Sequence, residues 1–85
     1  MRFELRLERR AGKALRNLAE PDRSRVVSVL EALQDDPFSG DVKALSGSWR
    51  GFFRRRVGDY RILYAVDTEV RVVSVQSVSH RKDAY

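Results

Sequence analysis

The sequence predicts an α+β fold with the element order β-α-α-β-β-β, in which a helical hairpin packs on one face of a small, mostly antiparallel, four-stranded sheet. Two observations predict it. Polar and apolar residues alternate at residues 2–7 and in several runs after residue 51, as in half-buried strands. Between these runs, residues 8–34 carry apolar side chains at helical spacing. The length of 85 residues predicts one domain, residues 1–85, with a single small core.

The N-terminal part predicts one strand and two helices. In residues 2–7, three apolar residues alternate with charged ones, which indicates a strand with one buried face. In residues 8–18, apolar residues recur at i, i+4 and i+7, which indicates a short amphipathic helix. Pro21 suits the first turn of a second helix, which runs to about residue 34 and ends before Pro37.

The C-terminal part predicts a loop and three strands. Residues 38–51 are rich in serine and glycine and indicate a loop, in which Trp49 either covers the hydrophobic layer or offers a surface for stacking on a base. Strands at residues 51–57 and 60–67 follow, and then a strand at residues 70–79. The valines of this last strand fall on both faces, which predicts an interior position in the sheet.

The hairpin at Gly58-Asp59 organises the predicted site. A two-residue loop with glycine is typical of a tight β-hairpin, and it places Arg56 opposite Arg61. Because side chains alternate between faces, Arg54 joins these two arginines on one face, away from the helices. Arg55 falls on the core face, so either its head group reaches the rim of the core or the register is off by one residue.

The arginine cluster has two interpretations. Like charges directly opposite each other destabilise a sheet, and an anion bound between them would remove that cost. The planar guanidinium suits phosphate, so the first interpretation is a phosphate-binding face on rigid strands. The second is a solvated cationic face whose charge is balanced by nearby acids.

Composition limits the function further. The net charge is +5, from 17 basic and 12 acidic residues, which favours an anionic partner, either a nucleic acid or an acidic protein. The chain has no cysteine and one histidine, so we expect neither disulfides nor a metal site, and we expect no cofactor. No apolar run has the length of a membrane span or a signal peptide, so a cytoplasmic protein without a membrane partner is predicted.

Two segments resemble a known family. One is Arg54-Arg55-Arg56-Val57-Gly58-Asp59-Tyr60-Arg61-Ile62-Leu63-Tyr64, and the other is Val78-Ser79-His80-Arg81-Lys82-Asp83-Ala84-Tyr85. Further matches are Leu15 and Leu18, Leu33 and Pro37, and the segment Lys43-Ala44-Leu45-Ser46-Gly47. Over nearly its whole length the chain resembles the RelE/ParE superfamily of bacterial toxin–antitoxin toxins, and it is closer to the RelE branch.

The RelE resemblance implies a RelE-like fold and an activity. RelE-like toxins cleave messenger RNA on the ribosome without a metal, by attack of the 2′-hydroxyl on the adjacent phosphate, and so inhibit translation. Carried onto this sequence, the implied catalytic residues are Arg54, Arg56, Arg61, Arg81 and Tyr85. Lys43, Arg55, His80 and Lys82 are implied as residues that bind RNA or its phosphates.

Single residues have defined expected roles within that activity. Clustered guanidiniums stabilise the charge of a pentacovalent phosphorane, a role that fits Arg61 and Arg56. Arg81 donates to the leaving 5′-oxygen, and Tyr85 stacks on a base or orients the phosphate. His80 is either an acid or base, or a hydrogen-bonding residue at the end of a strand. RelE-like chains have lysines where this chain has Phe52 and Arg54, and arginine is a poor general base at neutral pH.

Three functions therefore remain open at the level of sequence. The first is a ribosome-dependent endoribonuclease. The second is a ParE-like toxin that poisons DNA gyrase through protein–protein contact. The third is a catalytically inactive homologue whose arginines serve only to bind an antitoxin. Both toxin hypotheses imply a small acidic cognate antitoxin that forms a hetero-oligomer with the chain, and the first also implies messenger RNA on the ribosome as a partner.

Overall fold

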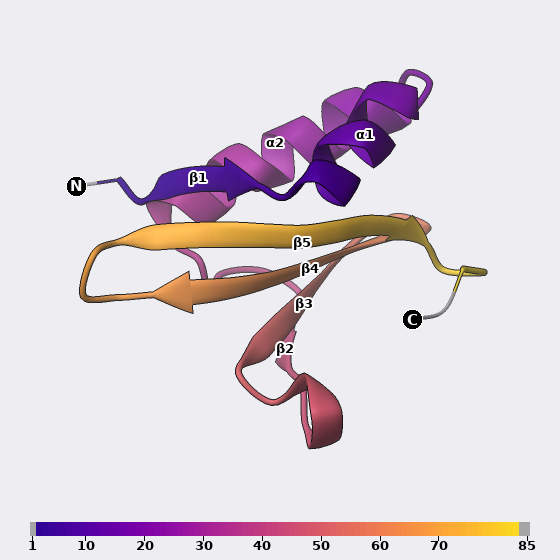
Figure 1. Cartoon of the computed structure of the whole chain (residues 1–85). Helices are drawn as coiled ribbons and strands as arrows, with labels where there is room; N and C mark the ends of the chain where they lie inside the picture. Colours follow the sequence, from indigo (N-terminus) through magenta and orange to yellow (C-terminus); the bar gives the residue numbers. More distant parts are fainter. Residues whose placement is uncertain (1, 84–85) are drawn as a thin grey trace.

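The computed structural model describes residues 2–83. Its elements are β1 (Glu4–Leu7), α1 (Arg9–Asn17), α2 (Asp22–Asp35), β2 (Val42–Ala44), the 3₁₀ turn η1 (Gly47–Trp49), β3 (Phe52–Val57), β4 (Tyr60–Asp67) and β5 (Val72–His80). The five strands form one sheet in the order β1-β5-β4-β3-β2. Both helices lie on the same side of this sheet, and β3 and β2 curl away from them (Figure 1).

The predicted α+β fold is confirmed, but the sheet has five strands instead of four. The additional strand is β2, which lies in the segment predicted to be a loop and pairs antiparallel with β3. It has only three residues, so alternation cannot reveal it in a segment rich in serine and glycine. Its backbone covers the edge of β3 that would otherwise be unpaired.

The strand β5 occupies the interior of the sheet, as predicted, between β4 and β1. It pairs antiparallel with β4 and parallel with β1. Its valines lie on both faces, as predicted, with Val72 buried on the face away from the helices. The register shifts between Leu63 and Tyr64, with Gln76 as the extra residue of β5, and this shift moves Val78 to the helix-covered face. Val73, Val75 and Val78 consequently all belong to the core beneath the helices.

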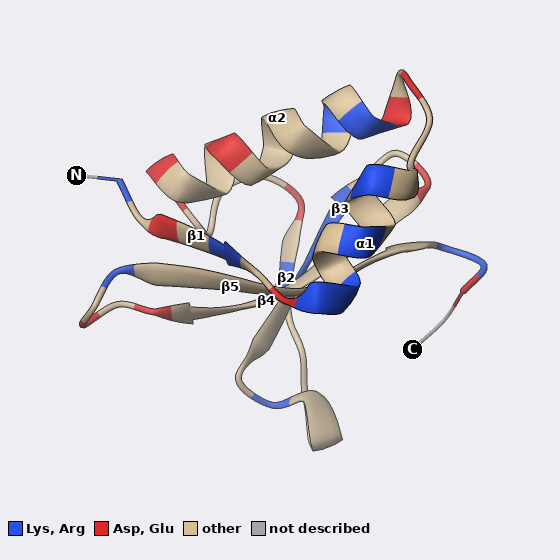
Figure 2. Ribbon diagram, turned by 45° about the horizontal axis from the view of Figure 1, so that its top comes forward, with Lys and Arg blue, Asp and Glu red and all other residues tan. Residues whose placement is uncertain are grey.

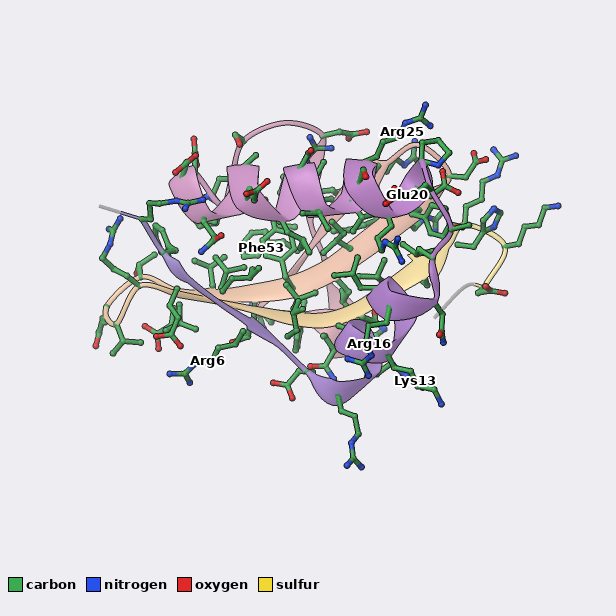
Figure 3. All side chains as sticks on the ribbon, turned by 90° about the horizontal axis from the view of Figure 1, so that it is seen from above. Arg6, Lys13, Arg16, Glu20, Arg25 and Phe53 are labelled. Carbon is green, nitrogen blue, oxygen red and sulfur yellow. The ribbon has the colours of Figure 1, made fainter. Side chains whose placement is uncertain are left out.

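The helices bury apolar side chains against this core. Ala11 of α1 is fully buried, and α2 contributes Val26, Leu30 and Leu33. Basic residues are distributed along the ribbon of α1 (Figure 2), and the side chains of Lys13 and Arg16 are exposed (Figure 3). In the part of the chain that the structure describes, neither helix has the length and apolar character needed to cross a bilayer.

A buried tyrosine joins the sheet to the segment after α2. Tyr64 is fully buried, and its hydroxyl donates a hydrogen bond of 2.6 Å to the carbonyl of Pro37. Burial raises the pKa of Tyr64 to about 12. Phe53 packs beside Tyr64, with a ring-centroid distance of 5.8 Å, and makes an edge contact with Phe38 (Figure 3). This side of β3 and β4 therefore has its polar group paired and its apolar groups covered.

Candidate phosphate-binding site

The arginine cluster lies on the sheet face that the helices leave uncovered. The Gly58-Asp59 loop is two residues long, Gly58 has φ of +57°, and Arg56 pairs with Arg61 as predicted. Residues adjacent in sequence, such as Val57 and Ile62, belong to the core beneath the helices. Since side chains alternate along each strand, Arg56 and Arg61 project from the opposite face.

Strand register aligns the site residues in two rows. The first row crosses β2, β3, β4 and β5 and consists of Lys43, Arg54, Leu63 and Ser77. The second row crosses β3, β4 and β5 and consists of Arg56, Arg61 and Ser79. Side chains directly opposite each other have Cβ atoms about 4.5–5.5 Å apart. We call these two rows the arginine face.

The charge of the arginine face is not compensated within residues 2–83. Arg54, Arg56 and Arg61 form no ion pair there, whereas ion pairs do form at several exposed positions elsewhere on the surface. The like charges of Arg56 and Arg61 lie directly opposite each other, which destabilises the sheet by roughly 0.2–1 kcal/mol. Among the described residues, no acid lies within ion-pair distance of these three arginines, which favours the phosphate-binding interpretation over the solvated face.

Two polar atoms on this face are buried without a hydrogen-bond partner. Leu63 is 1% exposed although it lies outside the core beneath the helices, and Arg54 in the same row is half-buried. Arginine stems can cover apolar surface in this way while the head group stays near water. Arg54 Nε and Ser79 Oγ are shielded from solvent and have no hydrogen-bond partner in the structure. Because buried polar atoms are normally paired, the face has unused capacity for hydrogen bonding.

Arg55 points to the other side of the sheet, as the alternation requires. A Cβ added at Gly40 would lie 2.7 Å from Arg55 Nε, so the guanidinium packs against the backbone of that glycine. The same guanidinium donates a hydrogen bond to the carbonyl of Arg56. Gly40 itself has a φ of +83°, in the left-handed region that favours glycine. Arg55 thus holds the segment before β2 and does not join the two rows of the arginine face.

The outer end of the arginine face differs from the central part. Lys43 on β2 is exposed and lies opposite Arg54, so it extends the cationic surface to the edge of the sheet. Phe52, two residues before Arg54 on the same face, makes an edge contact with Trp49 at a centroid distance of 5.7 Å. The position at which RelE-like chains have a lysine is therefore part of an aromatic pair.

Arg81 is anchored to the hairpin loop. Its backbone N–H donates to the Asp59 carbonyl at 2.7 Å, and its Nη1 lies 3.6 Å from Asp59 Oδ1. Arg56 and Arg61 lie on the two strands that this loop joins, so Arg81 is placed beside the second row, two residues beyond Ser79. The ion pair is exposed on both sides, with side-chain exposures of 62% and 59%, and contributes little to stability. The guanidinium of Arg81 can leave Asp59 for a stronger anion at small cost.

His80 lies opposite Tyr60 at the end of β5, with ring centroids 5.2 Å apart in an edge contact. Its Nδ1 accepts a hydrogen bond of 3.2 Å from the backbone N–H of Lys82. Burial raises the pKa of the Tyr60 hydroxyl, and the nearby carboxylate of Asp22 raises it further. The geometry matches the hydrogen-bonding, strand-end role for His80, and the acid–base role stays a prediction. Lys82 is exposed, and Tyr85 lies outside the described residues.

Sequence analysis missed Ser79 and Ser77 as members of the site. Without the register shift at Leu63, alternation from Val72 would not place these serines in line with Arg61 and Leu63. The only signal in the sequence is that polar Ser77 and Ser79 alternate with Val78 immediately before Arg81. Among residues 2–83, no three histidine or acidic side chains gather closely enough to hold a metal ion.

Comparison with known proteins gives consistent matches. A model of the family described as "ParE toxin of type II toxin-antitoxin system, parDE" matches residues 5–85. RelE1 of Methanocaldococcus jannaschii, described as a candidate toxin, is 28% identical over 88 residues, which cover 100% of this chain and 97% of that protein.

Two solved structures share the fold over nearly the whole chain. One is a chain of the toxin–antitoxin complex RelBE2 of Mycobacterium tuberculosis, with a TM-score of 0.85, 29% identity, and coverage of 95% of this chain and 100% of that chain. The other is a chain of the archaeal RelE–RelB complex of Pyrococcus horikoshii OT3, with a TM-score of 0.83, 27% identity, and coverage of 99% and 100%.

Proposed function

The chain belongs to the ParE toxin family of type II toxin–antitoxin systems, and we propose that it is a toxin that inhibits translation as a ribosome-dependent messenger RNA endoribonuclease. The observation that carries this proposal is the arginine face, on which Arg54, Arg56 and Arg61 share a rigid surface and lack ion-pair partners among the described residues. A surface of this kind suits a substrate whose charge is carried by phosphate.

The chemistry follows from the position of the charges. The 2′-oxygen of the substrate forms a bond to the adjacent phosphorus, the bond from phosphorus to the 5′-oxygen breaks, and the products are a 2′,3′-cyclic phosphate and a 5′-hydroxyl. Negative charge grows on the phosphorane, and Arg56 and Arg61 stabilise it because their positive charges are already in place. Arg81, beside the hairpin loop next to this row, donates a hydrogen bond to the leaving 5′-oxygen, and water supplies the proton that this oxygen takes up.

The proton of the attacking 2′-hydroxyl needs an acceptor. Arginine stays protonated at neutral pH, so the arginine face itself offers no general base. In this proposal water accepts the proton, and electrostatic stabilisation supplies most of the acceleration. We therefore expect slower cleavage than in an enzyme that places a lysine near the 2′-hydroxyl, because Phe52 and Arg54 occupy those positions here.

The proposed protein partner is a small acidic antitoxin. Similar chains occur in the RelBE2 and RelE–RelB complexes, which supports a hetero-oligomer of toxin and antitoxin. The net charge of +5 favours an acidic partner, and association with it should be slower at higher ionic strength. The same charge favours a cytoplasmic location near RNA, which forms part of the proposal.

One alternative has a specific observation in its favour. The matching family is described as ParE toxins, and a ParE-like toxin acts on DNA gyrase by protein–protein contact. In that case Arg56 and Arg61 would contact an acidic surface and would perform no chemistry.

The test is inducible expression of the chain in bacteria, followed by genome-wide mapping of the 5′ ends of messenger RNA. Codon-phased cuts within translated regions are expected, and they should disappear in Arg61→Ala. The matched control is Arg25→Ala, which removes an exposed arginine of α2 that lies outside the arginine face. A DNA-damage response without cuts would instead establish the gyrase alternative.

A further inference from the structure

Ser79 is the feature of the arginine face that the proposed chemistry leaves unexplained. Its hydroxyl lies on the central part of the sheet, opposite Arg61, and is shielded from solvent. It makes no hydrogen bond in the structure. A buried hydroxyl without a partner costs roughly 1–3 kcal/mol relative to one that is satisfied, and a serine is therefore an unfavourable choice for this position in the free protein.

A second unsatisfied atom lies on the same face. Arg54 Nε is buried and unpaired, one row away from Ser79. Arg54 on β3 and Ser79 on β5 lie on the two strands that flank β4, and Arg61 lies on β4 between them, opposite Ser79 and two residues from the partner of Arg54. Both atoms are hydrogen-bond donors, so a single acceptor group placed over Arg61 suits both of them.

The dimensions of the second row fit a phosphate group. Neighbouring strands are about 4.8 Å apart, so the row from Arg56 through Arg61 to Ser79 spans about 10 Å between its outer backbones. Arg56 and Arg61 form no ion pair with the described residues, so their side chains can swing outward to bind an anion. Because Arg61 lies directly opposite Ser79, an anion bound by Arg61 would lie close to the Ser79 hydroxyl.

We propose that Ser79 is a phosphate-binding residue of the arginine face, whose hydroxyl donates a hydrogen bond to a non-bridging oxygen of the substrate phosphodiester while Arg56 and Arg61 bind its charge. Arg54 Nε donates to the second non-bridging oxygen. Ser79 therefore helps to select a tetrahedral phosphate over a planar carboxylate, since a fork of arginines alone accepts both. The inference rests on the proposed endoribonuclease function.

The experiment compares the wild-type protein with Ser79→Ala and Ser79→Thr. The probe is an RNA trinucleotide with 2′-deoxyribose at its first two positions, which lacks the hydroxyl that would attack either phosphate and so stays intact. Binding is measured by titration of backbone amide NMR signals, and cleavage is measured separately on ribosome-bound message. A hydrogen bond to a charged group contributes enough that Ser79→Ala should weaken binding about 10-fold and slow cleavage by at least as much.

Stability provides the readout that separates this role from a structural one. Because the hydroxyl has no partner in the free protein, Ser79→Ala should leave the melting temperature unchanged or raise it. Ser79→Thr keeps the hydroxyl and should retain most of the binding and cleavage. Ser74→Ala is the matched control, since Ser74 lies on the same strand and face but pairs with Ala65, beyond the two rows.

The outcomes distinguish the two proposals. Wild-type protein that neither binds the trinucleotide nor cleaves ribosome-bound message overturns the endoribonuclease function, and the role of Ser79 with it. If the wild-type protein is active and Ser79→Ala is equally active, the role of Ser79 is overturned while the endoribonuclease function stands. A clear drop in the melting temperature of Ser79→Ala would also overturn it, because the hydroxyl would then stabilise the free fold.

Discussion

The two faces of β3 and β4 are built from alternate residues of the same strands, yet they differ in how their polar groups are treated. On the helix-covered face, the Tyr64 hydroxyl is buried and paired with Pro37, and Ile62 is fully enclosed. On the arginine face, Arg54 Nε and Ser79 Oγ are buried and unpaired, and Arg56 lies opposite Arg61. The first face pairs its buried hydroxyl internally, whereas the second leaves two buried polar atoms without a partner.

In this small domain, the residues that stabilise the fold and the residues available for function lie on opposite faces of the same strands. A chain of 85 residues has little stability in reserve, so it can tolerate an unfavourable face only on a well-packed support. The helix-covered face supplies that support from the same backbone. Substitutions of adjacent residues on these strands should therefore fall into two groups. Those on the helix-covered face should destabilise the fold, and those on the arginine face should reduce activity with little change in stability.

The largest expected effect is on the covered face. Ile62→Ala removes a fully buried side chain from the core and should lower the free energy of unfolding by about 2–5 kcal/mol. Chemical denaturation followed by circular dichroism measures this change. Arg61→Ala, one residue away on the other face, is the control and should change the stability little. Equal losses in the two variants would show that the faces are not energetically separate.

Arg81→Ala tests the other half of the comparison. Under the proposed mechanism it removes a hydrogen bond to the leaving oxygen, so it should slow cleavage of ribosome-bound message about 10²–10³-fold. The stability should hardly change, because the ion pair of Arg81 with Asp59 is exposed. Toxicity and 5′-end mapping in cells report the loss. Full toxicity of this variant would contradict the catalytic role and favour the gyrase alternative.

Tyr64→Phe should have a moderate effect on stability. It leaves the Pro37 carbonyl without its donor and should cost about 1–3 kcal/mol. The folded-state pKa of Tyr64, about 12, lies above the ordinary value of about 10. The wild-type protein should therefore keep its stability below pH 10 and lose some of it between pH 10 and about 12.

Denaturation curves recorded across that alkaline range test this expectation. Tyr64→Phe cannot ionise, so its stability should fall less steeply with pH than that of the wild-type protein. Parallel losses in both proteins would mean that other groups, such as Tyr60, dominate the alkaline transition.

The smallest effect should have the opposite sign. Arg56→Gln removes one of two opposed like charges while it keeps most of the side-chain stem, and it should stabilise the free protein by roughly 0.2–1 kcal/mol. The gain should shrink in high salt, which screens the repulsion between Arg56 and Arg61. Thermal unfolding at two salt concentrations measures both changes. A loss of stability would show that Arg56 has an attractive partner on this face.

Much of this arrangement could be predicted from sequence, because local patterns determine it. The glycine at position 58 fixed the hairpin register, and alternation then placed Arg54, Arg56 and Arg61 on one face. The helices followed from apolar spacing. These features depend on residues close together in the chain.

The features that sequence analysis missed depend on distant contacts. The three residues of β2 become a strand only because β3 offers an edge, and the parallel pairing of β1 with β5 joins opposite ends of the chain. The register shift beside Leu63 moved Ser77 and Ser79 into the rows of the arginine face. No pattern within a single strand could reveal these pairings.

The interior position of β5 has a consequence for the order of folding. Its partner β1 is synthesised first, yet it has no place to pair until residues 72–80 have been made. Contacts between such distant segments slow folding, because a long loop must close before they form. The same strand supplies Ser79 to the arginine face. In a nascent chain, the arginine face would therefore be completed by the same step that completes the sheet.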